Sequence, residues 1–597
     1  MLGIMADYTP PLREIAFVLH HIAGIDEIIE YPEYEHVDRD TIHGALDEAG
    51  RFMAELVAPT NRIGDTVGAT FADGAVTVPE AFKKVWSQYL AAGWNAVSGP
   101  PAYGGHGFPE TIGFAIKEMF VTANMAFSLC PMLTGSAITL LEHHGTEELR
   151  SIYLEKLVTA EWTGTMVLTE PEAGSDVGAL RSRARPNGDG SWSITGNKIF
   201  ITWGDHDLAD NIIHLVLARV PDAPPGTRGI SLFLVPKFLV NPDGSIGDRN
   251  AVEIVSIEHK LGIHASPTCV MAFEDATGWM IGEPNQGMRA MFTMMNQARV
   301  EVGLEGLAII ERAYQDAVAY AQERRQGRAI DTPKTESAPI IEHPDVRRML
   351  LTIKAYDEAS RALLYDTAAA VDRSRNHPDA DARNAASARL ALLTPVAKAW
   401  ASDLGVEMTS VAVQVFGGMG FVEESGVAQH YHDSRITPIY EGTNGIQAID
   451  LVTRKLPLDG GSLVRGFLAE IDGLDAALGE AGERFHPIRA NLRDGLEALT
   501  SATEWILAQE SPNDVLAGAT PYLRMFGTVA GGYYLAREAL HAAADLGANP
   551  GDSWLETKID TAVFYGSQLL PQAGGLLPAV TAGAQQLLSP DQLEVVG

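Results

Sequence analysis

The chain has 597 residues, of which 46% are hydrophobic and 20% charged, and its formal net charge is −33 at pH 7. This length allows about three or four domains, and the negative charge argues against nucleic acid as a partner, because it repels phosphate backbones. The cysteines Cys130 and Cys269 lie far apart in sequence, which argues against a disulfide framework and fits a reducing compartment, so we expect a cytoplasmic protein.

Residues 1–161 predict a helical domain with an N-terminal extension. The opening stretch "MLGIMADYTPPLREIAFVLHH" lacks a basic region and soon meets prolines, so we interpret it as mature protein and not as a signal peptide. "HGALDEAGRFMAELV" places Leu46, Phe52, Met53 and Leu56 on one helical face. "GTEELRSIYLEKL" begins like a helix. No unbroken apolar run reaches the length of a membrane span, so no span is expected.

The pattern changes over residues 162–286, which predict a β domain. "WSITGNKIFIT", "NIIHLVLARV" and "GISLFLVPKF" are short β-branched runs separated by Gly, Pro, Asp and Asn. "PNGDGSW" is typical of a turn between two strands. The middle of the chain therefore differs in structure from the part before it.

Helical patterns return over residues 287–455 and again over 463–597. Between them, "KLPLDGGS" has the Pro and Gly of a linker. Beyond the linker, apolar residues recur at helical spacing, namely Ile488, Leu492, Leu496 and Leu499. The fold class expected is α+β and multidomain, in the order helical, β, helical, helical.

Two motifs in the β domain suit a ligand. "MVLTEPEAGSDVGAL" (166–180) follows a strand and brings hydroxyls and exposed backbone N–H groups into a tight loop, which suits a phosphate or a polar ring edge. Taken alone, such a stretch is more often an ordinary connection. "GNKIFITWGD" (196–205) places Phe200 and Thr202 on one face of a strand, where they suit a flat ring, although a strand phenylalanine is more often a core residue.

Other candidate motifs point to simpler interpretations. "QVFGGMGF" (414–421) and "YGGHGF" (103–108) are glycine-rich, but neither is a G-x-G-x-x-G after a strand, so a Rossmann fold is not expected. Three arginines in "YAQERRQGR" (320–328) are typical of cations at a helix C-terminus. His430 and His432 lack a further ligand cluster, so no metal site is predicted.

Glu441 stands between a tyrosine and a glycine in "ITPIYEGTNGIQ" (436–447). An isolated Glu-Gly is usually a solvated charge or the first-turn acid of a helix. The wider context decides, because these stretches together resemble one family.

Over about residues 40–455 the sequence resembles the FAD-dependent acyl-CoA dehydrogenases. The matching stretches, in family order, are "AYGGHG", "GTEELRSIYLEKL", "VLTEPEAGSD", "GNKIFIT", "EHKLGIHASPT", "YAQERRQ", "VFGGMGF" and "DSRITPIYEGTNGIQ". The N-terminal start and the C-terminal extension resemble the long branch with 3-methylmercaptopropionyl-CoA dehydrogenases and bacterial fatty acyl-CoA dehydrogenases. The resemblance implies an N-terminal helical domain, a middle β-barrel-like domain and a C-terminal four-helix bundle, with the flavin between the last two.

The resemblance also implies contact residues. Those expected to bind FAD are Met166, Leu168, Thr169, Gly174, Ser175, Phe200, Ile201, Thr202, Arg324, Gln414, Gly417, Gly418, Thr443 and Asn444. Those expected at the acyl-CoA substrate are Ser175, Asn296, Arg299, Tyr440 and Gly442. Arg324 and the Gln414 segment correspond to positions that reach a neighbouring subunit's FAD, which implies a homodimer or a higher homo-oligomer. This sequence departs from the family at Asn296, where an acid is common, and at His432, which replaces an arginine.

Glu441 falls on the family's catalytic base, and Ala298 occupies the position where some relatives carry the base instead. The implied reaction is α,β-dehydrogenation of an acyl-CoA to a trans-2-enoyl-CoA. A carboxylate removes the α-proton as general base, hydride passes from the β-carbon to flavin N5, and the glycine after Glu441 lets the backbone come close.

Substrate and acceptor stay open at this stage. The substrate is expected to be 3-methylthiopropionyl-CoA or a fatty acyl-CoA, and the electron acceptor an electron-transfer flavoprotein. One alternative is an acyl-CoA oxidase, which also carries extra C-terminal helices and passes electrons to oxygen. Another is a flavin-containing nucleic-acid-binding relative, which the acidic stretch "LAEIDGLDAALGEAGE" opposes.

Overall fold

The computed structural model describes residues 6–330 and 336–589. The chain forms two compact units. The β-containing unit consists of residues 8–10 and 33–301, and the helical unit consists of residues 6–7 and 11–32 together with the described residues from 302 onward. The four predicted domain ranges stay a prediction, and their outer ends, residues 1–5 and 590–597, lie outside the described residues. The segment 11–32 belongs to the helical unit, which the sequence did not indicate.

Some helices of the β-containing unit begin at a residue whose side chain caps the first turn. The helices before its sheet are α3 (Arg39–Phe52), α4 (Ala58–Val67), α5 (Glu80–Ala91), α6 (Glu110–Ala123), α7 (Met125–His144) and α8 (Glu147–Val158). Asp38, Asn124 and Thr146 each accept a hydrogen bond at the start of α3, α7 and α8. The predicted helix start in "GTEEL" is therefore confirmed. The predicted apolar face spans α3 and the π-helical turn Met53–Val57 that follows it. Leu46 and Met53 on this face are buried, whereas Phe52 and Leu56 are partly exposed.

Within residues 6–330 and 336–589, two helical segments are long and apolar enough to cross a membrane by length and composition, α7 and Ala380–Phe421. The sequence predicted no membrane span because no unbroken apolar run is long enough, and these two segments have no such run. Within the most apolar window, 83% of α7 and 44% of the other segment are buried inside the protein. Core helices of proteins without a membrane span pass the same test, so this is weak evidence for a span.

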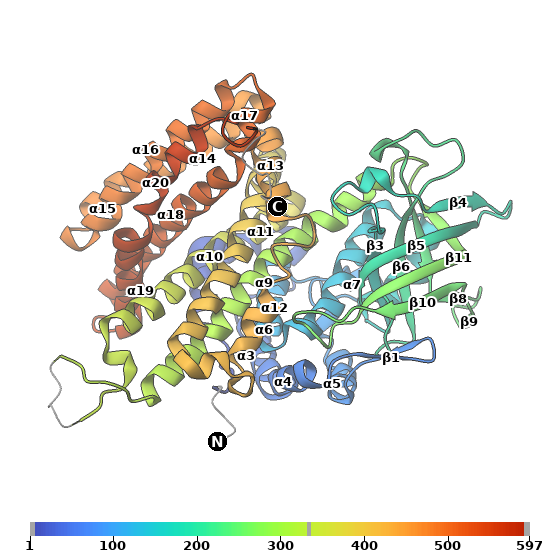
Figure 1. Cartoon of the computed structure of the whole chain (residues 1–597), viewed down its shortest axis with the longest axis horizontal. Helices are drawn as coiled ribbons and strands as arrows, with labels where there is room; N and C mark the ends of the chain where they lie inside the picture. Colours follow the sequence, from blue (N-terminus) through green and yellow to red (C-terminus); the bar gives the residue numbers. More distant parts are fainter. Residues whose placement is uncertain (1–5, 331–335, 590–597) are drawn as a thin grey trace, which may run out of the picture. The chain divides into compact units, whose positions relative to one another are not determined.

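The longer strands of the β-containing unit form one sheet (Figure 1). Its strands are β3 (Trp162–Val167), β4 (Arg183–Pro186), β5 (Trp192–Thr202), β6 (Asn211–Ala218), β7 (Ser231–Pro236), β10 (Val252–Ile257) and β11 (Thr268–Ile281). The order is β3-β6-β7-β11-β5-β4, with β10 also paired to β11. Strands β3 and β6 are parallel, and the other neighbours are antiparallel. Among the described strands this path does not close, so the domain expected to be barrel-like is built on an open sheet.

The predicted strands and turn are present in this sheet. Asn187 N donates to Ser191 O at 3.0 Å, which forms the turn expected in "PNGDGSW". Strands β6 and β7 are buried at every residue, which explains why apolar residues dominate both strands and do not alternate with exposed polar ones. Two short hairpins accompany the sheet, β1 (Thr70–Ala72) with β2 (Ala75–Thr77) and β8 (Phe238–Val240) with β9 (Ile246–Arg249).

The helical unit is built from long helices and shorter connecting ones. It contains α1 (Leu12–Val18), α2 (Ile25–Ile28), the part of α9 (Gly287–Glu323) from residue 302 on, α10 (Pro344–Asn376), α11 (Ala380–Phe416), α12 (Val427–Ser434), α13 (Asn444–Asp450), α14 (Ser462–Asp472), α15 (Asp475–Glu480), α16 (His486–Ala508), α17 (Pro512–Ala517), α18 (Ala519–Ala548), α19 (Ser553–Phe564) and α20 (Gln572–Thr581). Helices α10 and α11 lie side by side (Figure 1). The break predicted near 455–462 is confirmed, because Asp459 and Gly460 leave the helical conformation. The predicted face of α16 is buried.

Helix α18 accommodates the largest side chain of α11 at two glycines. Trp400 is fully buried. A Cβ placed on Gly527 would lie 2.3 Å from Trp400 Cγ, and one on Gly531 would lie 2.7 Å from Trp400 Cη2. Only glycine leaves room for the indole here, so these positions set how closely α11 and α18 approach.

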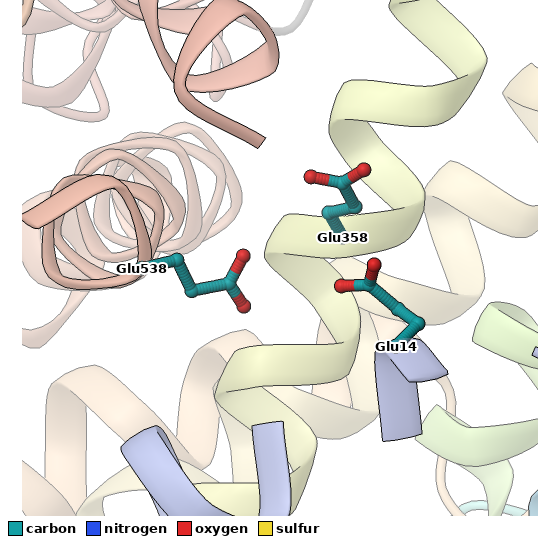
Figure 2. Close-up of side chains that lie close together, drawn as sticks. All are labelled: Glu14, Glu358 and Glu538. Atoms are coloured by element: carbon teal, nitrogen blue, oxygen red, sulfur yellow. The ribbon is translucent and has the colours of Figure 1, made fainter. Parts of the chain in front are cut away.

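Within this unit, a buried ionic cluster joins α1 to α10, α18 and α19. Glu14 of α1, Glu358 of α10 and Glu538 of α18 point toward one another (Figure 2). Three converging carboxylates suggest a metal site, but the Lys558 ammonium already donates hydrogen bonds to all three. The cation that balances them is therefore a side chain. Lys354 forms a second ion pair with Glu358.

Candidate active site

The two ligand motifs of the β-containing unit lie side by side, although about thirty residues separate them in sequence. Ile199 N donates to Thr169 O at 3.0 Å, and Thr165 Oγ1 donates to Thr202 O at 2.7 Å. These bonds bring the end of β3 next to the end of β5. Met166 is buried, whereas Leu168 and Thr169 are partly exposed. The motif residues predicted to contact FAD therefore share one region of this unit.

A buried ion pair shapes the loop between these motifs. Glu170 accepts hydrogen bonds from Arg181 N at 2.6 Å and from Ser182 N at 3.0 Å, and Lys198 Nζ donates to its carboxylate at 2.9 Å. Burial lowers the pKa of Lys198 to about 8, against the pull of Glu170. Burial opposes the charge of Glu170, yet Lys198 and the loop N–H groups outweigh it and lower the pKa of Glu170. Both groups are thus charged at neutral pH.

Sequence reasoning missed this pair, although each motif supplies one partner: the glutamate of "TEPEAGSD" and the lysine of "GNKIFIT". The bonds of Glu170 fold the segment between residues 170 and 182 into a loop, on which Gly174 and Ser175 are exposed. A Cβ on Gly174 would meet no atom within 4 Å, so the backbone there is open to a ligand.

Phe200 has a conformation that a large side chain rarely adopts. Its φ is +59°, and its side chain is 58% exposed. The register of β5 on β11 shifts between Lys198 and Ile201, so Phe200 sits in a bulge. Non-glycine residues with positive φ are strained and gather at functional sites. An exposed aromatic ring held in this way suits stacking on a flat ligand.

The residues beside Phe200 differ in what they can offer. Thr202 is partly exposed, whereas Ile201 is 1% exposed and packs in the hydrophobic core of the sheet. The predicted alternation is therefore present at the end of β5. Because the Ile201 side chain is buried, its predicted FAD contact stays a prediction for the backbone atoms.

In the helical unit, Glu441 lies in a strained turn between α12 and α13. Its φ is +55° and that of Gly442 is +84°. Thr443 caps α13, because its Oγ1 accepts from Ile446 N at 3.2 Å. Gln447 Nε2 donates to Gly442 O at 3.2 Å. A carboxylate-bearing residue in the left-handed region is again typical of a functional site.

Helix α11 supports this turn through a buried lysine. Lys398 Nζ donates to Thr437 O at 2.8 Å and to Asn444 Oδ1 at 2.7 Å. The Asn444 amide donates in turn to Asp403 Oδ1 at 2.6 Å. The side chain of Asn444 thus holds the 437–444 turn in place, and its predicted FAD contact stays a prediction for the backbone. A single lysine in the apolar run "TPVAKAWASD" was the signal that sequence reasoning did not use.

Tyr440, predicted to contact substrate, is partly buried, and its hydroxyl donates a hydrogen bond to the Glu305 carboxylate. Burial, together with Glu305 and Glu441, holds the pKa of Tyr440 well above its usual range, so the phenol stays a donor.

Two predicted substrate contacts, Asn296 and Arg299, lie on α9 together with Ala298, just before the helix passes into the helical unit at residue 302. Ala298 is buried and offers no carboxylate. Asn296 is exposed, and Arg299, 8% exposed, donates to Asn296 Oδ1 at 3.4 Å. The same region holds Glu301, whose carboxylate pairs with Lys117 Nζ at 2.6 Å in the β-containing unit.

The residues expected to reach a neighbouring subunit gather at one exposed end of the helical unit. Tyr320 of α9 stacks on Phe416 of α11, with ring centroids 4.1 Å apart, so the two helices end together. The predicted contact residues near these ends are all exposed, namely Arg324, Gln414, Gly417 and Gly418. Phe421 beside them is 92% exposed. The two histidines of the same region do not converge, because His430 pairs with Asp316 at 2.8 Å and His432 faces Glu423.

These surfaces fit FAD by their chemistry. An exposed aromatic ring at Phe200 suits the flavin ring, and open backbone with a hydroxyl at Gly174 and Ser175 suits its polar edge. The Arg324 guanidinium suits a pyrophosphate, and a Cβ on Gly417 or Gly418 would meet nothing within 4 Å, which leaves space for a ligand.

The fold and these motifs define a flavoprotein dehydrogenase. Family models match in order: the acyl-CoA dehydrogenase N-terminal domain over 43–161, middle domain over 165–276, C-terminal domain over 285–456, and an acetyl-CoA dehydrogenase C-terminal-like domain over 464–591. The chain belongs to the acyl-CoA dehydrogenase family, enzymes that use FAD to oxidise a CH–CH bond of an acyl-CoA.

Relatives support this assignment over the full length. The chain is 43% identical to the 3-methylmercaptopropionyl-CoA dehydrogenase of Ruegeria pomeroyi, over 98% of this chain and 99% of that one. It is 36% identical to a butyryl-CoA dehydrogenase of Syntrophomonas wolfei, over 96% and 97%. A solved structure reported for the electron transferring flavoprotein of Acidaminococcus fermentans is similar with a TM-score of 0.58 and 26% identity, covering 70% of this chain and 97% of that one.

Proposed function

We propose that Glu441 is the general base of this dehydrogenase and that it removes the α-proton of the bound acyl-CoA. The observation that carries the proposal is the strained conformation of Glu441, with φ of +55° in a turn held by buried side chains. Such strain persists only where the surrounding structure fixes it, and it gathers at active sites.

The residues divide the work as follows. The thioester α-carbon is a weak acid, so a carboxylate placed beside it accelerates proton removal. FAD, when bound, supplies the acceptor for the hydride from the β-carbon. Phe200 and Thr202 orient the flavin ring, Ser175 reaches both cofactor and substrate, and Gly442 allows the backbone to approach the substrate.

Replacement of Glu441 by glutamine tests the proposal. Glu441→Gln keeps the size of the side chain and removes the base, so fold and FAD content are kept. Flavin bleaching by acyl-CoA, measured by anaerobic stopped flow, slows by about 10²–10⁴-fold, the usual loss for a general base. Glu424→Gln, an exposed carboxylate before α12, is the matched control and bleaches like the wild type.

Bleaching of Glu441→Gln within about tenfold of the wild type shows that another residue is the base. Glu301 and Glu305 are then the next residues to replace. Glu301 pairs with Lys117, and Glu305 accepts a hydrogen bond from Tyr440.

For the substrate, we propose 3-methylthiopropionyl-CoA ahead of straight-chain fatty acyl-CoAs. The support is the 43% identity to a protein named for that substrate, against 36% to one named for butyryl-CoA. Turnover of acyl-CoAs of graded length, with 3-methylthiopropionyl-CoA included, tests this. A clear preference for long straight chains contradicts it.

For the acceptor, we propose an electron-transfer flavoprotein, in a cytoplasmic homodimer or higher homo-oligomer. The relatives reported above carry dehydrogenase names, which gives the oxidase alternative no support. The exposed Arg324 and Gln414 segments support assembly around FAD. Aerobic reoxidation of the reduced flavin separates the two acceptors, and light scattering of the holoenzyme gives its assembly state.

A further inference from the structure

The 437–444 turn has to hold Glu441 in an unfavourable conformation, and its supports lie on both sides of that residue. On the C-terminal side, Asn444 is bound to Lys398 of α11 at 2.7 Å. On the N-terminal side, the neighbouring Tyr440 is bound through its hydroxyl to Glu305 of α9. Glu441 therefore stands between one contact to α11 and one contact to α9.

The two supporting helices are fixed to each other at this level. A Cβ on Gly306 would lie 2.3 Å from Ala401 O, and a Cβ on Gly303 would lie 2.6 Å from Ala397 O. These glycines flank Glu305 on α9, and the alanines flank Lys398 on α11. Backbone contact this close leaves little freedom for one helix to move against the other, so the two contacts of the turn keep a constant separation.

The Glu305 contact has features of a strong hydrogen bond. Glu305 is 0% exposed, and its carboxylate lies 135 residues from Tyr440 in sequence. A phenol that donates to a carboxylate in a buried site makes a charge-assisted bond. Tyr440 lies in the turn and Glu305 in the middle of α9, so neither side chain caps the end of a helix.

We propose that Glu305 is a positioning residue for the reaction: it holds Tyr440 and thereby fixes the place of the Glu441 carboxylate. The inference rests on the proposed function of Glu441. The acceptor oxygen of Glu305 carries the effect, so glutamine at this position keeps it and leucine loses it.

A double-mutant cycle tests this inference on the FAD-loaded enzyme. Glu305→Leu and Tyr440→Phe each slow anaerobic flavin bleaching about 10- to 100-fold, because a displacement of about 1 Å at a reacting group costs on the order of a hundredfold. The double variant is no more than about threefold slower than the slower single one, since both remove the same hydrogen bond. Glu305→Gln bleaches within about threefold of the wild type.

Glu311→Gln is the matched control, because Glu311 is a buried carboxylate on the same helix that pairs with Arg361 at 2.8 Å. It lowers stability without slowing bleaching. Effects of Glu305→Leu and Tyr440→Phe that multiply, or Glu305→Gln as slow as Glu305→Leu, overturn the proposal. If Glu305→Leu does not fold, Tyr440→Phe still removes the bond while Glu305 stays in place.

Hydrogen exchange separates this inference from the proposal on Glu441. Both single variants raise amide exchange in the peptide covering residues 436–447 to the same extent, and the double variant raises it no further. Unchanged exchange in both variants overturns the positioning role whatever the base is. Rapid bleaching of Glu441→Gln with raised exchange in Glu305→Leu overturns the base assignment alone.

Discussion

Lys558→Met removes the ammonium that three buried carboxylates share, and the consequence follows from a count of charges. The cluster holds two ammonium groups, Lys354 and Lys558, and three carboxylates. Burial, with Glu14 and Glu358 nearby, raises the pKa of Glu538 to about 8 despite Lys558. At neutral pH one carboxyl is therefore protonated, and the cluster is balanced.

Without Lys558 one more carboxylate has to take up a proton or remain buried and unpaired. Protonating a carboxyl of ordinary pKa, about 4.3, costs about 3.7 kcal/mol at pH 7 and about 1 kcal/mol at pH 5. The cost at pH 7 lies within the roughly 3–5 kcal/mol found when one partner of a buried pair is removed. The carboxyls of the native variant bind one proton more than those of the native wild type, whereas the carboxyls of the two unfolded chains bind the same number. The loss of stability therefore shrinks by about 1.4 kcal/mol per pH unit as the pH falls from 7 toward 4.3.

Urea unfolding of wild type and variant between pH 5 and pH 7.5 measures this dependence. Arg465→Ala, which breaks the exposed pair with Glu504, is the control and costs less than about 1 kcal/mol at any of these pH values. Glu538→Gln resembles the protonated carboxyl and costs little. A Lys558→Met loss below about 1 kcal/mol at pH 7, or one that does not change with pH, refutes the charge count.

Other predictions concern single contacts. Burial, with Lys237 and His214 nearby, lowers the pKa of His206 to about 3. The native imidazole therefore stays neutral while the unfolded chain gains a proton below about pH 6.5, so stability falls as the pH drops from about 6.5 toward 3. His206→Gln reduces the slope of the unfolding free energy against pH by about 1.4 kcal/mol per pH unit in urea titrations, and an unchanged slope contradicts the assignment. Gly527→Ala brings a methyl group into Trp400 and costs about 1–3 kcal/mol. Gly547→Ala on the same helix meets nothing within 4 Å and stabilises by about 0.5–1 kcal/mol; equal melting temperatures of these two variants contradict the packing argument.

The elements that sequence patterns predicted are those with local causes. Strand β5 follows from the β-branched residues of "WSITGNKIFIT", the start of α8 from Thr146, and the face of α16 from four apolar residues at helical spacing. Each of these signals depends on neighbours within a few residues of one another, so the sequence displays it directly.

The supports of the candidate site could not be predicted in this way. Lys398 meets Asn444 across 46 residues, and Glu305 meets Tyr440 across 135. Burial of charged groups also opposes their usual preference for water, so composition argues against such pairs. The left-handed conformations of Phe200 and Glu441 contradict the propensity of both residue types, and only the surrounding structure imposes them.

The pairing of Glu14 with Lys558 has a consequence for the order in which the protein is made. The two residues are 544 positions apart, and a ribosome adds about 5–20 residues per second. Helix α1 therefore leaves the ribosome roughly half a minute to two minutes before its lysine partner exists. During this interval Phe17, which is buried in the finished protein, lacks its ring partner Trp554 of α19. Folding of the helical unit is therefore completed only after most of the chain has been synthesised, because residues 11–32 and the residues from 302 onward belong to the same unit.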